Sequence, residues 1–232
     1  MSTQPGSSRC SVRLTSGERV AVGTVFALGR NFAEHAREMD APPEPVVFLK
    51  PATSVLPGGG TVAWPFGSHE VHHEVELVLL LGDAGRDLDR ESARRAISAL
   101  AVGVDLTARD LQTEAKRRGG PWARSKGFPG AAPVSAFLPL ENLPVDMNEI
   151  DLRLDVGGRD RQVAMVSEML LDPPAIVVLL SRWFDLRRGD LIFTGTPAGV
   201  GPLSPGEPVT AESRALSLSV AFSLARPAGP GP

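Results

Sequence analysis

The stretch VHHEVELVLLL, residues Val71–Leu81, is the strongest strand candidate in the chain because its second half is an unbroken run of Leu and Val. Alternate side chains of a strand share a face, so Glu74 and Glu76 would point the same way, together with His72. Two neighbouring carboxylates repel each other and are costly to bury without a counter-charge. A hard divalent cation would remove that cost, and a strand end with both glutamates in solvent is the alternative.

The chain on either side of this strand predicts a strand-rich α+β protein. Its 24 glycines and 21 prolines are scattered, which suits many turns between short strands. Neither a linker nor an internal repeat divides the chain, so we expect one domain over residues 11–225, a disordered segment at 1–10 and a frayed tail at 226–232. Further strands are predicted at residues 19–28, 46–50, 101–105, 150–156, 191–194, 209–212 and 215–224, and helices at residues 31–39, 92–100, 107–117 and 173–184.

The composition argues against several classes of protein. With 24 Lys and Arg against 27 Asp and Glu, the net charge is −3, which disfavours a nucleic-acid partner. No apolar run is long enough to cross a bilayer, and the first residues lack the features of a signal peptide, so a cytoplasmic location is expected. Cys10 is the single cysteine, which rules out a disulfide within the chain. An anionic substrate would therefore need a local positive site, either a metal or placed Lys and Arg.

Asp105 is a candidate third ligand because it follows an apolar strand and precedes the start of a helix. A carboxylate in that place can face a cleft, whereas a favourable interaction with the helix dipole is the simpler explanation. His72 stays an alternative ligand, since it shares the predicted strand face with Glu74 and Glu76. Both sets contain the paired carboxylates that Mg²⁺, Mn²⁺ and Ca²⁺ favour.

His35 and Glu38 lie three residues apart in the predicted helix 31–39 and therefore share one face. A carboxylate that hydrogen-bonds an imidazole fixes its tautomer and raises its basicity, so the pair could take a proton from water. A surface pair without a function is the alternative. Serine and cysteine nucleophiles are unsupported, because the chain has no Gly-x-Ser-x-Gly elbow and Cys10 has no reactive setting.

Two glycine-flanked segments offer groups for an anionic substrate. Lys126, one of three lysines, lies in the segment WARSKGF at residues 122–128. Residues 194–201, TGTPAGVG, follow a predicted strand and match neither of the common glycine-rich phosphate or dinucleotide motifs. Backbone N–H groups and the Thr196 hydroxyl in this turn could hold a carboxylate. An exposed lysine and a tight turn without a ligand are the alternatives.

Each of these motifs is weak alone, but their order along the chain is specific. They are Gly29-Arg-Asn-Phe32, His35-Ala-Arg-Glu38, Phe48-Leu-Lys-Pro51, His72-His-Glu-Val-Glu76, Asp105-Leu-Thr-Ala-Arg-Asp110, Lys126-Gly-Phe128 and Thr194-Gly-Thr-Pro-Ala-Gly-Val-Gly201. In this order they resemble the fumarylacetoacetate hydrolase family, in particular its short acylpyruvase and fumarylpyruvate hydrolase branch. The resemblance covers nearly the whole chain. It implies a mixed β-roll-like fold, a homodimer, a small 2-oxo acid substrate and a part in aromatic catabolism.

The resemblance also implies roles for individual residues. The metal ligands, for Mg²⁺ or Mn²⁺, would be Glu74, Glu76 and Asp105. The catalytic groups would be the water-activating pair His35 and Glu38, and Lys126 for developing negative charge. The substrate contacts would be Arg109, Gln112, Thr196 and, with a less defined role, Lys50. Residues 163–166, which follow Gln162, depart from the family pattern and predict a changed substrate pocket.

The implied reaction is the metal-dependent hydrolysis of a 3-acylpyruvate, a 1,3-diketo acid. Attack of water on the distal carbonyl would cleave a carbon–carbon bond and release a carboxylic acid and the enolate of pyruvate, whose charge the metal would hold. Oxaloacetate decarboxylation stays an alternative that needs the same enolate but no attacking water. An isomerase or tautomerase of a related 2-oxo acid or 2-hydroxy-dienoate, and a non-catalytic oxo-acid-binding protein on the same fold, also stay open.

Overall fold

The computed structural model describes residues 10–34 and 45–225, and within them the strands form four sheets. The largest sheet has the order β4-β3-β15-β8-β9-β11-β5, with β12 beside β9. Its strands are β3 (Val25–Gly29), β4 (Val46–Lys50), β5 (Val55–Pro57), β8 (Val75–Leu81), β9 (Ile97–Val104), β11 (Ala132–Val134), β12 (Leu138–Pro139) and β15 (Leu191–Phe193). The strand-rich α+β class is thereby confirmed.

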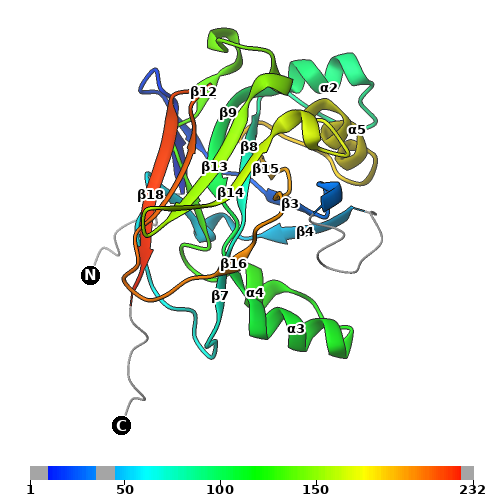
Figure 1. Ribbon diagram of the computed structural model, residues 1–232. Helices are drawn as coiled ribbons and strands as arrows, with labels where there is room; N and C mark the ends of the chain where they lie inside the picture. The colour runs from blue at the N-terminus through cyan, green and yellow to red at the C-terminus, as the bar shows by residue number, and fades with distance from the viewer. Residues whose placement is uncertain (1–9, 35–44, 226–232) are drawn as a thin grey trace, which may run out of the picture.

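A second sheet, in the order β14-β13-β17-β18-β6, packs against the first (Figure 1). Its strands are β6 (Gly60–Val62), β13 (Asp151–Val156), β14 (Arg159–Met165), β17 (Val209–Ser213) and β18 (Leu218–Leu224). Two small sheets complete the described part of the chain, a hairpin of β1 and β2 and a three-stranded sheet in the order β10-β7-β16. Their strands are β1 (Ser11–Arg13), β2 (Arg19–Ala21), β7 (Val71–His73), β10 (Thr107–Ala108) and β16 (Gly201–Pro202).

The central strand β8 is buried on both faces, which is why its sequence is apolar at every position after Glu76. On one face, Leu77 and Leu79 join the core that also contains the second sheet and α5. On the other face, Val78 and Leu80 join a second core with Phe193 of the neighbouring strand β15. A strand held by apolar packing on both sides is a rigid support for the polar residues at its beginning.

Four of the α-helices within the described residues lie in two pairs at different places in the fold (Figure 1). The helix α5 (Pro173–Trp183) packs on α2 (Arg90–Ala96), begins at the side-chain cap of Asp172 and buries Ile176 and Leu180 in the core. The other two helices, α3 (Arg109–Arg118) and α4 (Ala123–Lys126), contact each other and lie beside β10, near the small sheet that contains β7. This second pair therefore lies at the end of the fold where β8 begins.

Several predicted elements are confirmed, and others need correction. Strands over residues 46–50, 151–156 and 191–193 and the helix over 173–183 match the prediction. The predicted helix at 92–100 is wrong after Ala96, because Ile97 begins β9 and Leu100 pairs with Leu79 in the core. The helix predicted from Thr107 begins at Arg109.

The predicted strand at 19–28 divides into β2 and β3, which belong to different sheets. None of the helices within residues 10–34 and 45–225 has the length and apolar composition needed to span a bilayer. The predicted domain boundaries at residues 11 and 225 stay predictions.

Candidate active site

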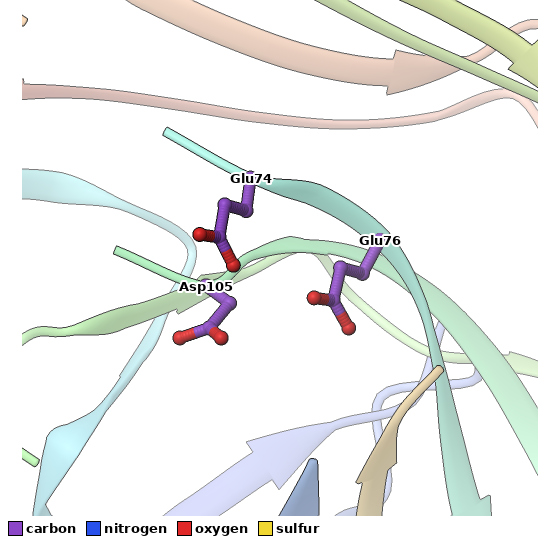
Figure 2. A group of neighbouring side chains, drawn as sticks. All are labelled: Glu74, Glu76 and Asp105. Carbon is purple, nitrogen blue, oxygen red and sulfur yellow. The ribbon is translucent and has the colours of Figure 1, made fainter. Parts of the chain in front are cut away.

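Glu74, Glu76 and Asp105 meet where two neighbouring strands end. Glu74 precedes β8, Glu76 lies on β8, and Asp105 follows the antiparallel neighbour β9, in which Val104 pairs with Val75. The backbone N–H of Asp105 donates to the Glu74 carbonyl oxygen at 2.8 Å, which joins the two strand ends. Figure 2 shows the three side chains turned toward one shared space. One carboxylate oxygen from each residue lies within 4.8 Å of the other two, so a single cation can contact all three.

The three carboxylates are buried, and positive side chains surround two of them. Glu74, Glu76 and Asp105 are only 6%, 1% and 0% exposed. Lys126 Nζ lies 2.8 Å from Glu74 Oε2 and 2.5 Å from Asp105 Oδ2. Lys50 Nζ lies 2.7 Å from Asp105 Oδ1, and an Arg109 nitrogen lies 2.5 Å from Glu74 Oε1. Charges buried to this degree are stable only when paired or bound to a metal.

Glu76 forms no ion pair with the described residues, and its carboxylate is held by a backbone donor. The N–H of Gly195 donates to Glu76 Oε2 at 2.7 Å. Burial, followed by the negative charges of Asp105 and Glu74, raises the pKa of Glu76 well above its ordinary value. In the absence of a metal the site therefore favours a proton on Glu76, and a bound cation would displace that proton.

The residues of the triad fit a hard divalent cation. Three carboxylates supply the oxygen ligands that Mg²⁺, Mn²⁺ and Ca²⁺ prefer. Asp105 Oδ1 is buried and receives no hydrogen bond of ordinary geometry from the described residues, so it has capacity for a further positive partner. The turn after β15 brings Gly195 against Glu76 because Gly195 has a φ of +99°, and a Cβ there would lie 2.7 Å from the Asn31 Cβ. A glycine is therefore required at this position.

His72 is not part of this group, although the sequence left it as an alternative ligand. The predicted strand 71–81 is interrupted at Glu74, so His72 belongs to β7 in a different sheet from β8. Its Nε2 lies 2.7 Å from Glu70 Oε1. Among the residues that the structure describes, the one cluster suited to a metal is Glu74, Glu76 and Asp105, as the family resemblance implied.

The predicted basic residues converge on the triad from distant parts of the chain. Lys50 Nζ also donates to the carbonyl oxygens of Lys126 and Ala131, so it fixes the segment that carries Lys126. Burial lowers the pKa of Lys126, but the ion pairs with Asp105 and Glu74 outweigh that effect and raise it above its ordinary value. Lys126 is therefore a permanently charged group in the site at neutral pH.

The predicted substrate contacts lie beside this cluster. Arg109 begins α3, and its other terminal nitrogen donates to Gln112 Oε1 at 2.5 Å. Gln112 is 3% exposed, and both residues line a small pocket next to Glu74. Thr196 is likewise buried, directly after Gly195. The water-activating pair predicted at His35 and Glu38 lies outside the described residues and stays a prediction.

Three polar residues near the site were not predicted from the sequence. Arg30 and Lys116 line the pocket beside Glu74, and Gln162 hydrogen-bonds to Thr196. A partial signal existed for Arg30, which lies in the quoted motif Gly29-Arg-Asn-Phe32 and adopts a φ of +66°, an uncommon conformation for a residue with a side chain. Lys116 and Gln162 carry no local signal, because only the fold brings them here.

Comparison with known proteins places this geometry in a family. The model of the fumarylacetoacetate (FAA) hydrolase C-terminal region matches residues 24–220. A mitochondrial oxaloacetate tautomerase from Bos taurus is 40% identical over 205 residues, which cover 88% of this chain and 92% of that protein. A mitochondrial oxaloacetate decarboxylase from Dictyostelium discoideum is 38% identical over 203 residues, which cover 86% of this chain and 93% of that protein.

A solved structure of a related protein has a similar fold. The crystal structure of fumarylpyruvate hydrolase from Pseudomonas aeruginosa, in complex with Mn²⁺ and pyruvate, superposes with a TM-score of 0.89 at 33% sequence identity. The match covers 97% of this chain and 99% of that one. With a family model matched over most of its length and relatives this similar in sequence and fold, the chain belongs to the fumarylacetoacetate hydrolase family.

Proposed function

We propose that the protein is a metal-dependent enzyme that interconverts the enol and keto forms of oxaloacetate. The observation that carries this proposal is the buried triad of Glu74, Glu76 and Asp105 with Lys126 beside it. A divalent cation held by the triad would act as a Lewis acid for the carboxylate and 2-oxo oxygens of the substrate. Tautomerisation passes through an enolate, whose negative charge needs preorganised positive groups in a site closed to water. Oxaloacetate tautomerases and a decarboxylase among the relatives support the same substrate.

A cluster of positive charge beside the triad favours a substrate with two carboxylates. Arg30, Arg109 and Lys116 line the pocket next to Glu74, together with Lys126. Partial burial, followed by the positive charges of Arg109 and Arg30, lowers the pKa of Lys116, so these like charges lie close enough to repel one another. Neither Arg30 nor Lys116 forms an ion pair with a described residue, and a second carboxylate on the ligand would relieve their repulsion. Oxaloacetate and fumarylpyruvate have that group, whereas acetylpyruvate does not.

The other predicted site residues would each have a separate role in this reaction. Arg109 and Gln112, joined by a hydrogen bond, would hold a substrate oxygen, and Thr196 would donate a hydrogen bond to the substrate's carboxylate. Lys126 would keep positive charge next to the developing enolate. His35, oriented by Glu38, would move the proton between carbon and solvent. A cytoplasmic location and a homodimer belong to the same proposal and stay predictions.

A second candidate reaction is the hydrolysis of a 3-acylpyruvate. The fold similarity to fumarylpyruvate hydrolase, over nearly the whole of both chains, favours it. Both reactions pass through the enolate of a 2-oxo acid, but hydrolysis also needs a water molecule that attacks the distal carbonyl and the cleavage of a carbon–carbon bond, which releases a carboxylic acid and the enolate of pyruvate. His35 and Glu38 would activate that water in a hydrolase. Oxaloacetate decarboxylation differs again, because carbon dioxide leaves and no water attacks.

An assay of several substrates, with and without metal, tests the proposal. We expect enol-oxaloacetate to be converted to its keto form in the presence of Mg²⁺ or Mn²⁺, and the rate to fall by more than about 100-fold after chelation, as for loss of a Lewis acid. Acetylpyruvate and fumarylpyruvate are the parallel substrates for hydrolysis, and release of carbon dioxide reports decarboxylation. Hydrolysis of a 3-acylpyruvate without any action on oxaloacetate would reject the tautomerase in favour of the second candidate. Oxalate binding without turnover of any of these substrates would indicate a binding protein.

Lys116→Met tests the role of the positive pocket in substrate choice. We expect the KM for oxaloacetate to rise about tenfold, which corresponds to losing one charged hydrogen bond, with a smaller change in kcat. The inhibition constant of pyruvate, which has a single carboxylate, should stay unchanged. Arg117→Met removes an exposed positive charge from the next position of α3 and is the matched control. An equal loss of affinity for pyruvate and oxaloacetate would contradict recognition of a second carboxylate.

A further inference from the structure

The side-chain amide of Gln162 joins the junction between β7 and β8 to the turn that follows β15. Its Oε1 accepts a hydrogen bond from the backbone N–H of Val75 at 3.1 Å and lies 2.9 Å from His73 Nδ1. Its Nε2 donates to the carbonyl oxygen of Pro197 at 2.9 Å and to Thr196 Oγ1 at 2.8 Å. Gln162 is 1% exposed, and its amide makes all four of the hydrogen bonds that it can make.

The directions of these hydrogen bonds follow from two partners that each have a single role. A backbone N–H can only donate, so Val75 fixes the position of the amide oxygen. A carbonyl oxygen can only accept, so Pro197 fixes the position of the amide nitrogen. The second hydrogen of Nε2 then points at Thr196, whose hydroxyl oxygen must accept it. The Thr196 hydroxyl therefore keeps its own proton for a different acceptor.

Within the described residues no acceptor takes that proton, although Thr196 is only 3% exposed. Buried polar groups nearly always have a partner, so an acceptor is expected from a bound molecule. Thr196 directly follows Gly195, and the backbone N–H of Gly195 donates to the carboxylate of Glu76. Thr196 is therefore the next residue along the chain from a group that contacts the triad. We propose that Gln162 is a positioning residue that holds the Thr196 hydroxyl as a donor to a carboxylate oxygen of the 2-oxo acid. This inference rests on the proposed function only in its choice of ligand.

The same amide also fixes the neighbouring histidine. Because Oε1 can only accept, His73 must donate to it from Nδ1. The network therefore runs in one direction, from His73 through Gln162 to Thr196 and on to the ligand. His73, Gln162 and Thr196 come from segments that are far apart in the sequence. The tertiary structure therefore determines which group donates each hydrogen bond in this network.

A binding experiment with oxalate tests this role. Oxalate resembles the carboxylate and oxo oxygens of an enolised 2-oxo acid and cannot react, so its dissociation constant is measured by calorimetry on the Mg²⁺-loaded protein. Thr196→Val should weaken oxalate binding about tenfold, as for a lost hydrogen bond to a charged group, whereas Thr196→Ser should stay within about threefold of the unmodified protein. Gln162→Met should weaken binding in the presence of Thr196 and have no further effect in the Thr196→Val background.

The double-mutant comparison separates positioning from a general loss of structure. If Gln162→Met weakens oxalate binding by the same factor in the unmodified protein and in the Thr196→Val variant, the role of Gln162 is structural and the inference is overturned. Unchanged oxalate affinity in Thr196→Val would overturn it as well. If Gln162→Met does not fold, Gln162→Glu serves the same cycle, because it keeps the acceptor for Val75 and His73 but loses the donor to Thr196. Since oxalate binding requires no turnover, failure of the oxaloacetate assay with an intact cycle would reject only the proposed reaction.

Discussion

Glu76→Gln is expected to abolish turnover while it makes the metal-free protein more stable at neutral pH. Glu76 supplies one of three carboxylates within 4.8 Å of each other, and its backbone contact with Gly195 leaves the rest of its carboxylate for a cation. An amide oxygen carries no charge and holds a hard cation weakly. Losing a residue that only hydrogen-bonds to a metal ligand lowers metal affinity by up to about 100-fold. Because Glu76 would itself be a ligand, we expect the metal affinity to fall by more than that.

The opposite effect on stability follows from the raised pKa of Glu76. Burial and the charges of Asp105 and Glu74 favour the protonated form in the folded, metal-free state. As the pH rises above the ordinary pKa of a glutamate, the unfolded chain loses this proton first, so the folded state loses stability until the pH passes the raised pKa. A glutamine never ionises and avoids that loss. The melting temperature of the chelated variant should therefore exceed that of the unmodified protein at pH 8, by about 2–4 °C for each kcal/mol of relieved repulsion.

Melting curves with and without Mg²⁺, at pH 5 and pH 8, check both parts of this prediction. The unmodified protein should gain stability from the metal, and more so at pH 8, because the metal competes with the proton on Glu76. The Glu76→Gln variant should show no such gain. Glu70→Gln is the matched control, since Glu70 is partly exposed in the same segment and contacts His72. Metal-dependent turnover in Glu76→Gln at the unmodified rate would reject the triad as the metal site.

Lys126→Met is expected to lose both activity and stability. The Nζ of Lys126 bridges Glu74 and Asp105 from a side chain that is 3% exposed. Removing one partner of a buried ion pair leaves uncompensated charge and costs about 3–5 kcal/mol, which lowers the melting temperature by roughly 6–20 °C. Turnover should fall about 100- to 1000-fold, as for other losses of preorganised charge at a developing anion. Added Mg²⁺ should restore part of the stability, because a second cation then faces the same carboxylates.

The pH dependence of this variant provides an internal check. The ion pairs with Asp105 and Glu74 outweigh the effect of burial and raise the pKa of Lys126, so its stabilising charge is present at neutral pH and is lost only as the pH rises through that alkaline value. Titration of Lys126 itself should therefore add no pH dependence between pH 6 and pH 8, so any change with pH in the difference in melting temperature between Lys126→Met and the unmodified protein should come from the carboxylates, in particular Glu76, whose raised pKa Lys126 lowers. Arg117→Met, on an exposed face of α3, controls for the loss of one positive charge. A Lys126→Met variant with unchanged melting temperature would contradict the ion pairs described above.

The sequence by itself determined the central strand and the three carboxylates proposed as metal ligands. An apolar run such as Leu77–Leu81 can only be stable with both faces covered, so the buried strand β8 follows from composition. The spacing of Glu74 and Glu76 places both carboxylates on one side of the chain, and the apolar residues before Asp105 place it at the end of a strand. The order of these motifs also indicated the family, which the comparisons confirm.

The tertiary structure decided what local pattern could not. His72 fits the alternation of a strand as well as Glu74 does, but β7 pairs with β10 and β16, so the strand breaks and His72 faces Glu70. The helix predicted through Leu100 ends at Ala96 because pairing with β8 outweighs the helical preference of that segment.

Long-range contacts decided the rest of the site. Lys50 reaches the carbonyl oxygen of a residue 76 positions away, and Gln162 reaches His73 across 89 positions. Such contacts depend on which strands become neighbours, and a single sequence carries no local periodicity that records this. The carboxylates suited to a cation were therefore visible in the sequence, whereas the groups that pair with them and orient them depend on how the strands and helices pack together.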